Sequence, residues 1–181
     1  MPPPDHPYAG ERYVPRVPQC ALAARSVTPQ VEPFLLRYSG GAFGELILTW
    51  AVSLSSRVCA PHLVRREVRT WTAWSGNTDQ GVQPIPNGSY WIQPDELWSC
   101  WMPTTTCNAG GWGDFRLTIH PYPTTNTGDR GGFFIHGGDH GTTNGCITLQ
   151  ARIGSFVNTL RQVLGSEMRC FIPFEVGPLP G

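Results

Sequence analysis

The sequence GGFFIHGGDHGTTNGCITL, residues 131–149, combines a short apolar run, a histidine, a glycine-rich segment and a cysteine. Residues 133–135 are three consecutive apolar residues, a pattern typical of a buried β-strand. Such a strand would carry His136 at its end, and the glycine-rich segment then leads to Cys146 and a second short apolar run. The stretch therefore predicts a histidine and a cysteine that meet across a flexible loop.

A histidine and a cysteine are the pair that thiol catalysis requires. The imidazole takes the thiol proton and stabilises the thiolate, which is the nucleophilic form. We interpret Cys146 as a nucleophile and His136 as its general base; a small buried cysteine and a core histidine bonded to backbone are the alternatives. Glycines also leave amide N–H groups exposed to substrate, so the amides of Gly145 and Cys146 are the candidate oxyanion donors.

The same residues resemble a known catalytic motif. Ile-His-Gly-Gly, a short loop and Gly-Cys-Ile, with ten positions from His136 to Cys146, are similar to the motif of the L,D-transpeptidases. The closest version is the compact one of L,D-transpeptidase-like effectors of bacterial type VI secretion. The segment GVQPIPNGSYWI, residues 81–92, is similar to the G-P-I-P-x-G-x-Y-x-I segment of that family. The resemblance extends over residues 71–174, with both segments in the family's order.

The resemblance implies a fold and a catalytic arrangement. The fold would be mainly β, an L,D-transpeptidase-like β-sandwich with one short helix after the catalytic cysteine. No carboxylate stands in a recognisable place to orient the imidazole, although Asp114 and Asp139 are in the chain. The resemblance implies instead that the backbone carbonyl of Gly137 accepts the N–H of the far ring nitrogen of His136 and so sets the tautomer.

The resemblance also implies a peptidoglycan-directed enzyme. It would cleave the bond between the L-centre of the third stem residue and the terminal D-alanine. Hydrolysis (L,D-carboxypeptidase action) or exchange with a D-amino acid would strip or cap donor stems and weaken the wall of a competitor. A housekeeping L,D-transpeptidase that forms 3-3 cross-links and a catalytically silent cell-wall-binding module are the alternatives.

Three positions depart from the family's usual pattern. Thr143 stands where serine is usual, and it keeps the hydroxyl. Asn144 replaces the second histidine of housekeeping transpeptidases, and Thr148 replaces their arginine or asparagine. These departures favour the effector branch. His140 could compensate for the missing histidine, or it could be a surface histidine of the loop.

The candidate substrate contacts are Arg130, Gly138 and Trp112. Arg130 precedes the predicted strand of His136 and could hold a substrate carboxylate, or form an ion pair with Asp129 or Asp114. Gly138 belongs to the glycine-rich loop, and Trp112 ends a tryptophan-rich segment that could stack on substrate.

A metal site is disfavoured. His136 and His140 have the spacing of a helical metal motif, but the glycines between them oppose the helix that would align both rings. We therefore expect neither a metal nor a cofactor.

Composition argues against nucleic-acid binding. The formal net charge is zero, charged residues make up 14% of the chain and no basic block occurs. Phosphate neutralisation, in contrast, needs clustered Lys or Arg. Lysine is absent, which removes Schiff-base and Ser–Lys chemistry.

We expect no signal peptide and no membrane span. Residues 1–13 are Pro-rich and charged without an apolar core, and no apolar run approaches the ~20 residues of a transmembrane helix. The expected path is synthesis in the cytoplasm, secretion without a cleavable signal and action in the periplasm of a target cell. The expected partners are peptidoglycan stem peptides, a cognate immunity protein and a component of a secretion apparatus.

Six cysteines suggest an oxidising destination. A nucleophilic Cys146 must stay reduced, which leaves an odd number for disulfides. Cys100 and Cys107 flank a Pro-Thr-Thr-Thr turn and could close a small loop. The pairing of the other three cysteines cannot be predicted: Cys20, Cys59 and Cys170.

The chain divides into an arm, a domain and a tail. Residues 1–33 contain eight of the 18 prolines and indicate an extended arm or linker, with a delivery or docking segment as the alternative. Residues 34–176 are the predicted catalytic domain and residues 177–181 the tail. A helix is predicted at about residues 151–164, where apolar residues recur with helical spacing up to Gly165.

Two further segments carry specific expectations. Residues 97–112 lack periodicity and are predicted to be a long loop. Residues 115–120 alternate apolar and polar side chains, which predicts a strand with one buried face.

Overall fold

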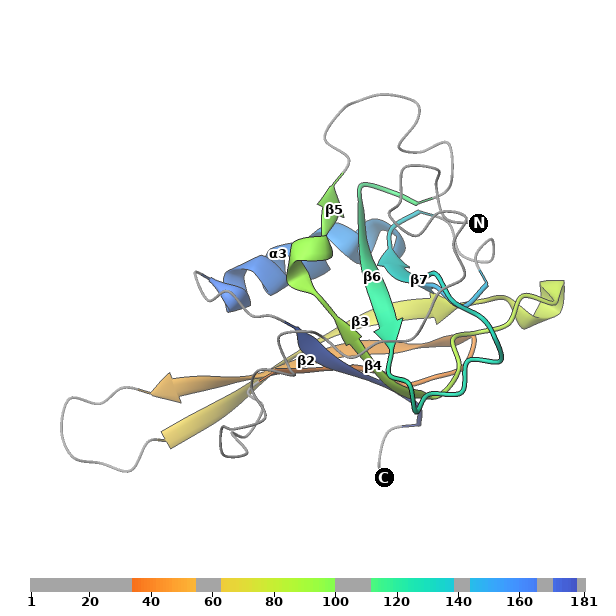
Figure 1. Cartoon of the computed structure of the whole chain (residues 1–181). Helices are drawn as coiled ribbons and strands as arrows, with labels where there is room; N and C mark the ends of the chain where they lie inside the picture. The colour runs from red at the N-terminus through yellow and green to blue at the C-terminus, as the bar shows by residue number, and fades with distance from the viewer. Residues whose placement is uncertain (1–33, 55–62, 100–111, 139–143, 166–170, 179–181) are drawn as a thin grey trace.

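The computed structural model describes residues 34–54, 63–99, 112–138, 144–165 and 171–178, with the backbone alone at 52–54 and 63–65. Within these ranges the protein is mainly β, as predicted, with a single α-helix (Figure 1). The strands are β1 (Phe34–Tyr38), β2 (Phe43–Leu54), β3 (Leu63–Ser75), β4 (Gly88–Ile92), β5 (Trp98–Ser99), β6 (Phe115–Pro121), β7 (Phe133–His136), β8 (Ile147–Thr148) and β9 (Ile172–Val176). The helices are α3 (Ile153–Leu164) and the short 3₁₀ turns η2 (Thr78–Gln80), η3 (Pro94–Glu96) and η4 (Gln150–Arg152).

All nine described strands belong to one mixed sheet. Their order is β4-β9-β1-β2-β3-β8-β7-β6-β5. β4 also pairs with β6, residues 90–92 lying opposite residues 119–121, so the sheet closes on itself in the manner of a barrel. Two of the pairings, β1 with β9 and β7 with β8, are parallel. The second of these carries the histidine and the residues that follow the cysteine.

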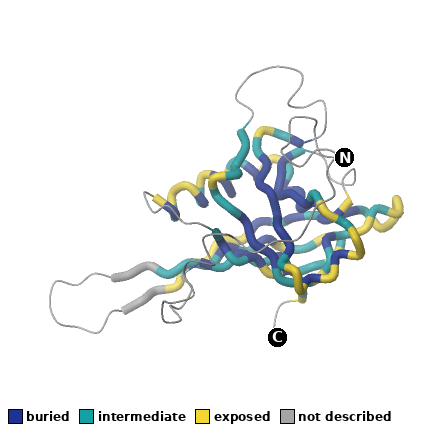
Figure 2. Tube along the Cα trace, in the orientation of Figure 1, coloured by how far each residue is buried: buried dark blue, intermediate teal, exposed yellow. Residues whose placement is uncertain are grey.

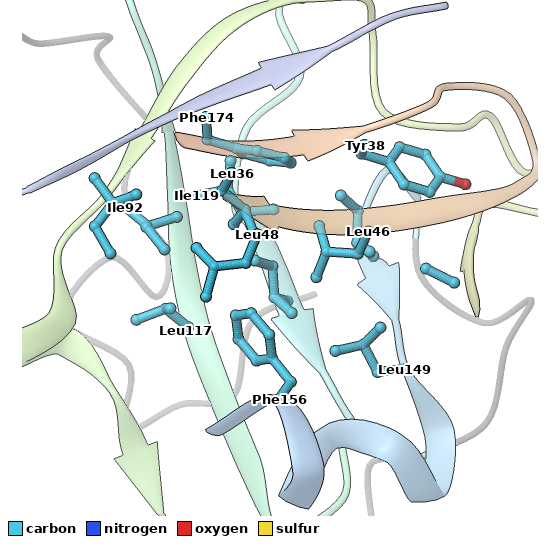
Figure 3. Close-up of a cluster of buried hydrophobic side chains, with 14 of the residues drawn as sticks. Leu36, Tyr38, Leu46, Leu48, Ile92, Leu117, Ile119, Leu149, Phe156 and Phe174 are labelled. Carbon is cyan, nitrogen blue, oxygen red and sulfur yellow. The ribbon is translucent and has the colours of Figure 1, made fainter. Parts of the chain in front are cut away.

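The main core is enclosed by the curved sheet and α3. Alternate residues along the strands point inward, as the two-residue period of a strand requires, and Figure 2 shows the buried residues gathered in the body of the sheet. Fully burying one such side chain contributes about 1.5–3 kcal/mol. Figure 3 shows part of this core, with residues from β1, β2, β6, β9 and α3: Leu36, Tyr38, Leu46, Leu48, Leu117, Ile119, Phe174 and Phe156.

The helix α3 lies where the apolar spacing predicts it. Its buried side chains are on one face, and Phe156 meets the Trp71 ring of β3 edge-on, with the ring centroids 5.3 Å apart. The indole N–H of Trp71 donates to the hydroxyl of Ser155 at 3.3 Å. Gly165 follows the helix with φ +53°, and its N–H bonds the carbonyl of Arg161. The residue expected just past the helix end is therefore confirmed.

Two expectations about the strands need correction. Residues 98–99, predicted to belong to a loop, form β5 opposite residues 115–116. The strand of residues 115–120 is buried on both faces rather than one, because its polar side chains are covered by neighbouring rings. Arg116 lies 4.0 Å from the Trp98 ring centroid, and His120 stacks on Trp91 at 4.1 Å. His120 also contacts the Glu96 carboxylate at 2.5 Å.

Several predictions fall outside the described residues. They concern the arm of residues 1–33, the end of the tail at residues 179–181, the Cys100–Cys107 disulfide and the three remaining cysteines, Cys20, Cys59 and Cys170.

Candidate active site

The parallel strands β7 and β8 bring His136 and Cys146 to one face of the sheet. His136 is opposite Thr148 in the register, and Cys146 stands two residues before Thr148. Cys146 packs with Phe134, which is two residues before His136 on β7, so Cys146 lies on the same face as His136 and diagonal to it. Standard sheet spacing separates the Cα atoms of such a diagonal pair by roughly 8 Å, within reach of a ring and a side chain.

This face carries a small apolar cluster of its own. Trp112, Phe134 and Cys146 pack together, separate from the main core. The Trp112 ring centroid lies 5.3 Å from that of Phe134 and 5.0 Å from that of His136. Trp112 is only 9% exposed, so it covers the face, and its predicted stacking on substrate stays a prediction.

A glycine contact explains how Trp112 reaches the histidine. Gly113 has φ +69°, and a Cβ there would lie 2.7 Å from the amide nitrogen of Gly138 and 2.8 Å from the Cα of Gly137. The two backbones can approach this closely because neither carries a side chain. The amide of Gly137 also donates to the carbonyl of Phe115 at 3.3 Å. The glycines after His136 thus hold Trp112 and Gly113 against the site.

Both ring nitrogens of His136 have defined hydrogen bonds. Nδ1 bonds the carbonyl oxygen of Gly137, and Nε2 lies 3.2 Å from the hydroxyl of Thr148. A carbonyl can only accept, so Nδ1 carries the hydrogen and Nε2 is the basic nitrogen. The hydrogen bond implied for Gly137 is present in the structure, while its role in catalysis stays a prediction.

Burial makes His136 a neutral imidazole. The ring is fully buried, which lowers the pKa of His136 to about 4, although the bond to Gly137 acts in the opposite direction. Burial disfavours the charged form of a histidine. At neutral pH Nε2 therefore has a lone pair that can take a proton from a thiol.

Cys146 is the one cysteine among the described residues, and it carries a thiol rather than a disulfide. It is 2% exposed, and its sulfur donates to the carbonyl of Gly132 at 3.8 Å. The residue before it, Gly145, has φ +94°, and a Cβ there would lie 2.5 Å from the Phe133 ring. Only glycine allows the chain to turn into Cys146 in this way. The oxyanion role of these two amides stays a prediction.

Arg130 joins the two segments on which the sequence interpretation rests. Its guanidinium donates to the carbonyl of Pro84 at 3.0 Å and to the side-chain oxygen of Asn144 at 3.3 Å. It also donates to the carbonyl of Thr127 at 3.3 Å. Residue 84 belongs to the segment 81–92, and Asn144 to the loop before the cysteine. The predicted contact of Arg130 with a substrate carboxylate, and the alternative ion pair, both stay predictions.

The structure also adds residues that sequence reasoning did not assign to the site. Arg116 is directly opposite His136 on β6, and Trp98 is opposite Arg116 on β5. With Thr148 these side chains form a row across four strands. The alternation along residues 115–120 predicted that Arg116 is on the polar face of its strand. Nothing in the sequence indicated that the strand of His136 would pair with it.

The remaining candidates divide between described and undescribed residues. Gly138 is partly buried with φ +75° and adjoins the site through Gly113. Thr143 and His140 lie outside the described ranges. Among the described residues, no group of three or more His, Cys, Asp or Glu side chains is arranged to hold a metal ion.

In the described part of the chain, no helix is long and apolar enough to cross a membrane. Comparison with known proteins gives no assignment, since the sequence matches no protein-family model and no curated protein at a significant level.

Proposed function

We propose that the protein is a cysteine acyl-transfer enzyme that acts on peptidoglycan stem peptides, and that its sheet is an L,D-transpeptidase-like domain. The observation that carries the proposal is that His136 and Cys146 share one face of the β7–β8 pair. The tautomer of His136, held by Gly137, leaves Nε2 as the base. The α-helix α3, which follows the cysteine, and the two sequence segments joined by Arg130 agree with this domain type.

The proposed reaction begins with proton transfer from the Cys146 sulfur to His136 Nε2. The thiolate attacks the carbonyl carbon between the L-centre of the third stem residue and the terminal D-alanine, and the amides of Gly145 and Cys146 bind the oxyanion. The C–N bond then breaks, the imidazolium protonates the leaving amine, and a thioester remains on Cys146. Water or the amine of a D-amino acid attacks the thioester and restores the thiol.

The proposed biological setting is antibacterial. The departures at Thr143, Asn144 and Thr148 favour the effector branch, for which hydrolysis or D-amino acid exchange is the expected outcome. Such an enzyme would act in the periplasm of a target cell, and its producer would need an immunity protein that blocks the site. Within this proposal Arg130, beside Asn144, is the candidate contact for a substrate carboxylate.

The reaction is tested by mass spectrometry of purified disaccharide-tetrapeptide muropeptides incubated with the protein, with and without D-methionine. Loss of the terminal D-alanine indicates hydrolysis, a D-methionine adduct indicates exchange, and a dimer indicates cross-linking. Cys146→Ala is the matched inactive variant. Unchanged muropeptides in the presence of folded protein with a reduced Cys146 would contradict the proposal.

A second experiment tests the nucleophile without any substrate. Iodoacetamide at neutral pH should label Cys146 faster than the other five cysteines, as measured on the Cys146 peptide. His136→Gln should remove this advantage while the protein stays folded. Equal labelling of all six cysteines in the wild-type protein would favour a silent binding module.

A further inference from the structure

Thr148 contacts the basic nitrogen of the proposed catalytic histidine. Its hydroxyl oxygen lies 3.2 Å from Nε2 of His136, and both residues are buried, Thr148 at 2% exposure and His136 at 0%. Because Nδ1 already donates to Gly137, the Thr148 hydroxyl is the donor in this contact and Nε2 the acceptor. The ring is therefore held at both of its nitrogens.

We propose that Thr148 is a positioning residue that fixes the orientation of the His136 ring, on the face that His136 shares with Cys146, and stabilises the imidazolium after proton transfer. The inference rests on the proposed function and extends it. Thr148 occupies the β8 position opposite His136, while Cys146 precedes it by two residues on the same face. The proposed nucleophile thus directly precedes the short strand that carries the group orienting its base.

A hydroxyl suits both states of the ring. Neutral Nε2 has one lone pair, so the hydrogen of the Thr148 hydroxyl turns away as Nε2 takes the proton from the sulfur of Cys146. The hydroxyl oxygen then accepts a hydrogen bond from the new N–H, since a hydroxyl both donates and accepts. Hydrogen bonds to charged groups contribute more than neutral ones. The contact therefore favours the imidazolium on balance, and with it the thiolate.

The charged and titratable neighbours of His136 affect the pH at which His136 takes the proton from Cys146. On the β6 side the neighbour is Arg116, whose guanidinium packs on Trp98, 4.0 Å from the ring centroid. On the β8 side it is Cys146, and the covering residue Trp112 has no ionisable group. Burial opposes a positive charge on His136, which makes a polar acceptor at Nε2 more important.

The test compares Thr148→Val, which keeps the shape and removes the hydroxyl, with Thr148→Ser, which keeps the hydroxyl. The control is Thr118→Val, a buried threonine on the same face, opposite Phe134 rather than His136. The measurement is the rate of Cys146 alkylation by iodoacetamide between pH 5 and pH 9, read on the Cys146 peptide. Thr148→Val should lower the neutral-pH rate roughly tenfold and move the profile upward by roughly half to one pH unit.

Thr148→Ser and Thr118→Val should both stay within about twofold of the wild-type rate. A purely structural role for Thr148 would lower stability without moving the pH profile. A Thr148→Val protein with the wild-type rate and profile overturns the inference and leaves the proposed function in place. Wild-type Cys146 that reacts no faster than the other cysteines overturns both.

A measurement on the wild-type protein keeps the inference testable should Thr148→Val fail to fold. The ¹⁵N resonances of the His136 ring should show a protonated Nδ1 and a hydrogen-bonded, unprotonated Nε2 at neutral pH. The opposite tautomer, with hydrogen on Nε2, would contradict the arrangement on which the inference depends.

Discussion

At the scale of single residues, the candidate site depends on a histidine that is kept neutral and oriented. Burial lowers the pKa of His136 to about 4, while Gly137 and Thr148 bond its two nitrogens. The neighbouring glycines serve the same geometry, because Gly113 and Gly145 leave space that no other residue would leave. Two consequences can be measured on the isolated protein.

The first consequence is a loss of stability in mild acid. Between pH 6.5, the ordinary pKa of a histidine, and pH 4, the unfolded chain binds a proton at His136 that the folded chain does not bind. The stabilising contribution is therefore complete above pH 6.5 and is lost as the pH falls to 4, by up to about 3 kcal/mol. Urea unfolding of wild type and His136→Gln over this range measures it. If the free energy of unfolding changed equally with pH in the two proteins, the expected contribution of His136 would be contradicted.

The second consequence concerns Gly145. Gly145→Ala should lower the free energy of unfolding by about 1–3 kcal/mol, because alanine is strained at φ +94° and its Cβ would overlap Phe133. Gly154→Ala is the control, since that glycine lies in α3 with nothing within 4 Å of an added Cβ. It should raise stability by about 0.5–1 kcal/mol. Chemical denaturation distinguishes the two, and an equal effect would show that the positive φ is unimportant.

At the scale of elements, α3 is attached to the sheet by one apolar face. Phe156 is fully buried and meets Trp71 edge-on. A Cβ added at Gly137 would lie 2.8 Å from the Cγ2 atom of Ile153. The helix therefore supports the loop after His136 as well as the core. Its attachment should matter for stability and for the site.

Phe156→Ala should lower the free energy of unfolding by about 3–5 kcal/mol, through lost burial and the cavity left behind. Asn158→Ala, at an exposed position of the same helix, should change it by less than about 0.5 kcal/mol. Urea unfolding followed by circular dichroism measures both. A similar effect of the two substitutions would argue that α3 is not packed on Trp71.

At the scale of the whole molecule, closure of the sheet joins distant parts of the chain. β4 pairs with both β9 and β6, and Arg130 connects the carbonyl of Pro84 to Asn144. The segment 81–92 thus contributes to the site through the backbone carbonyl of Pro84, which binds Arg130, and not through a catalytic side chain. A guanidinium can make these contacts at once because its donors point in several directions.

Arg130→Lys should lower the free energy of unfolding by about 1 kcal/mol, because a single ammonium cannot replace contacts to three separate oxygens. It should also slow the labelling of Cys146. Arg69→Lys, at an exposed position on β3, is the matched control and should change neither quantity. If the two variants had equal stability and equal labelling rates, the contacts of Arg130 would not be needed to join the two segments.

The strands around the site illustrate how far sequence reasoning reaches. The apolar run at 133–135 and the helix before Gly165 are local features, and the structure contains both of them. The bond of His136 to the carbonyl of Gly137, which the family resemblance implies, is also present. The burial of Arg116 and His120 was not predictable, because it depends on Trp98 and Trp91 from other strands. The two-residue β5 is too short to leave a periodic pattern.

The sequence by itself determined the mainly β character, the helix of α3 and the positions of His136 and Cys146 along the chain, since periodicity and glycine spacing act over a few residues. The tertiary structure decided that the two side chains share a face, that Trp112 covers them and that Thr148 meets Nε2. Those contacts follow from the parallel register of β7 and β8 and from sheet closure. Such pairings join residues far apart in the chain, and packing of the whole core selects them.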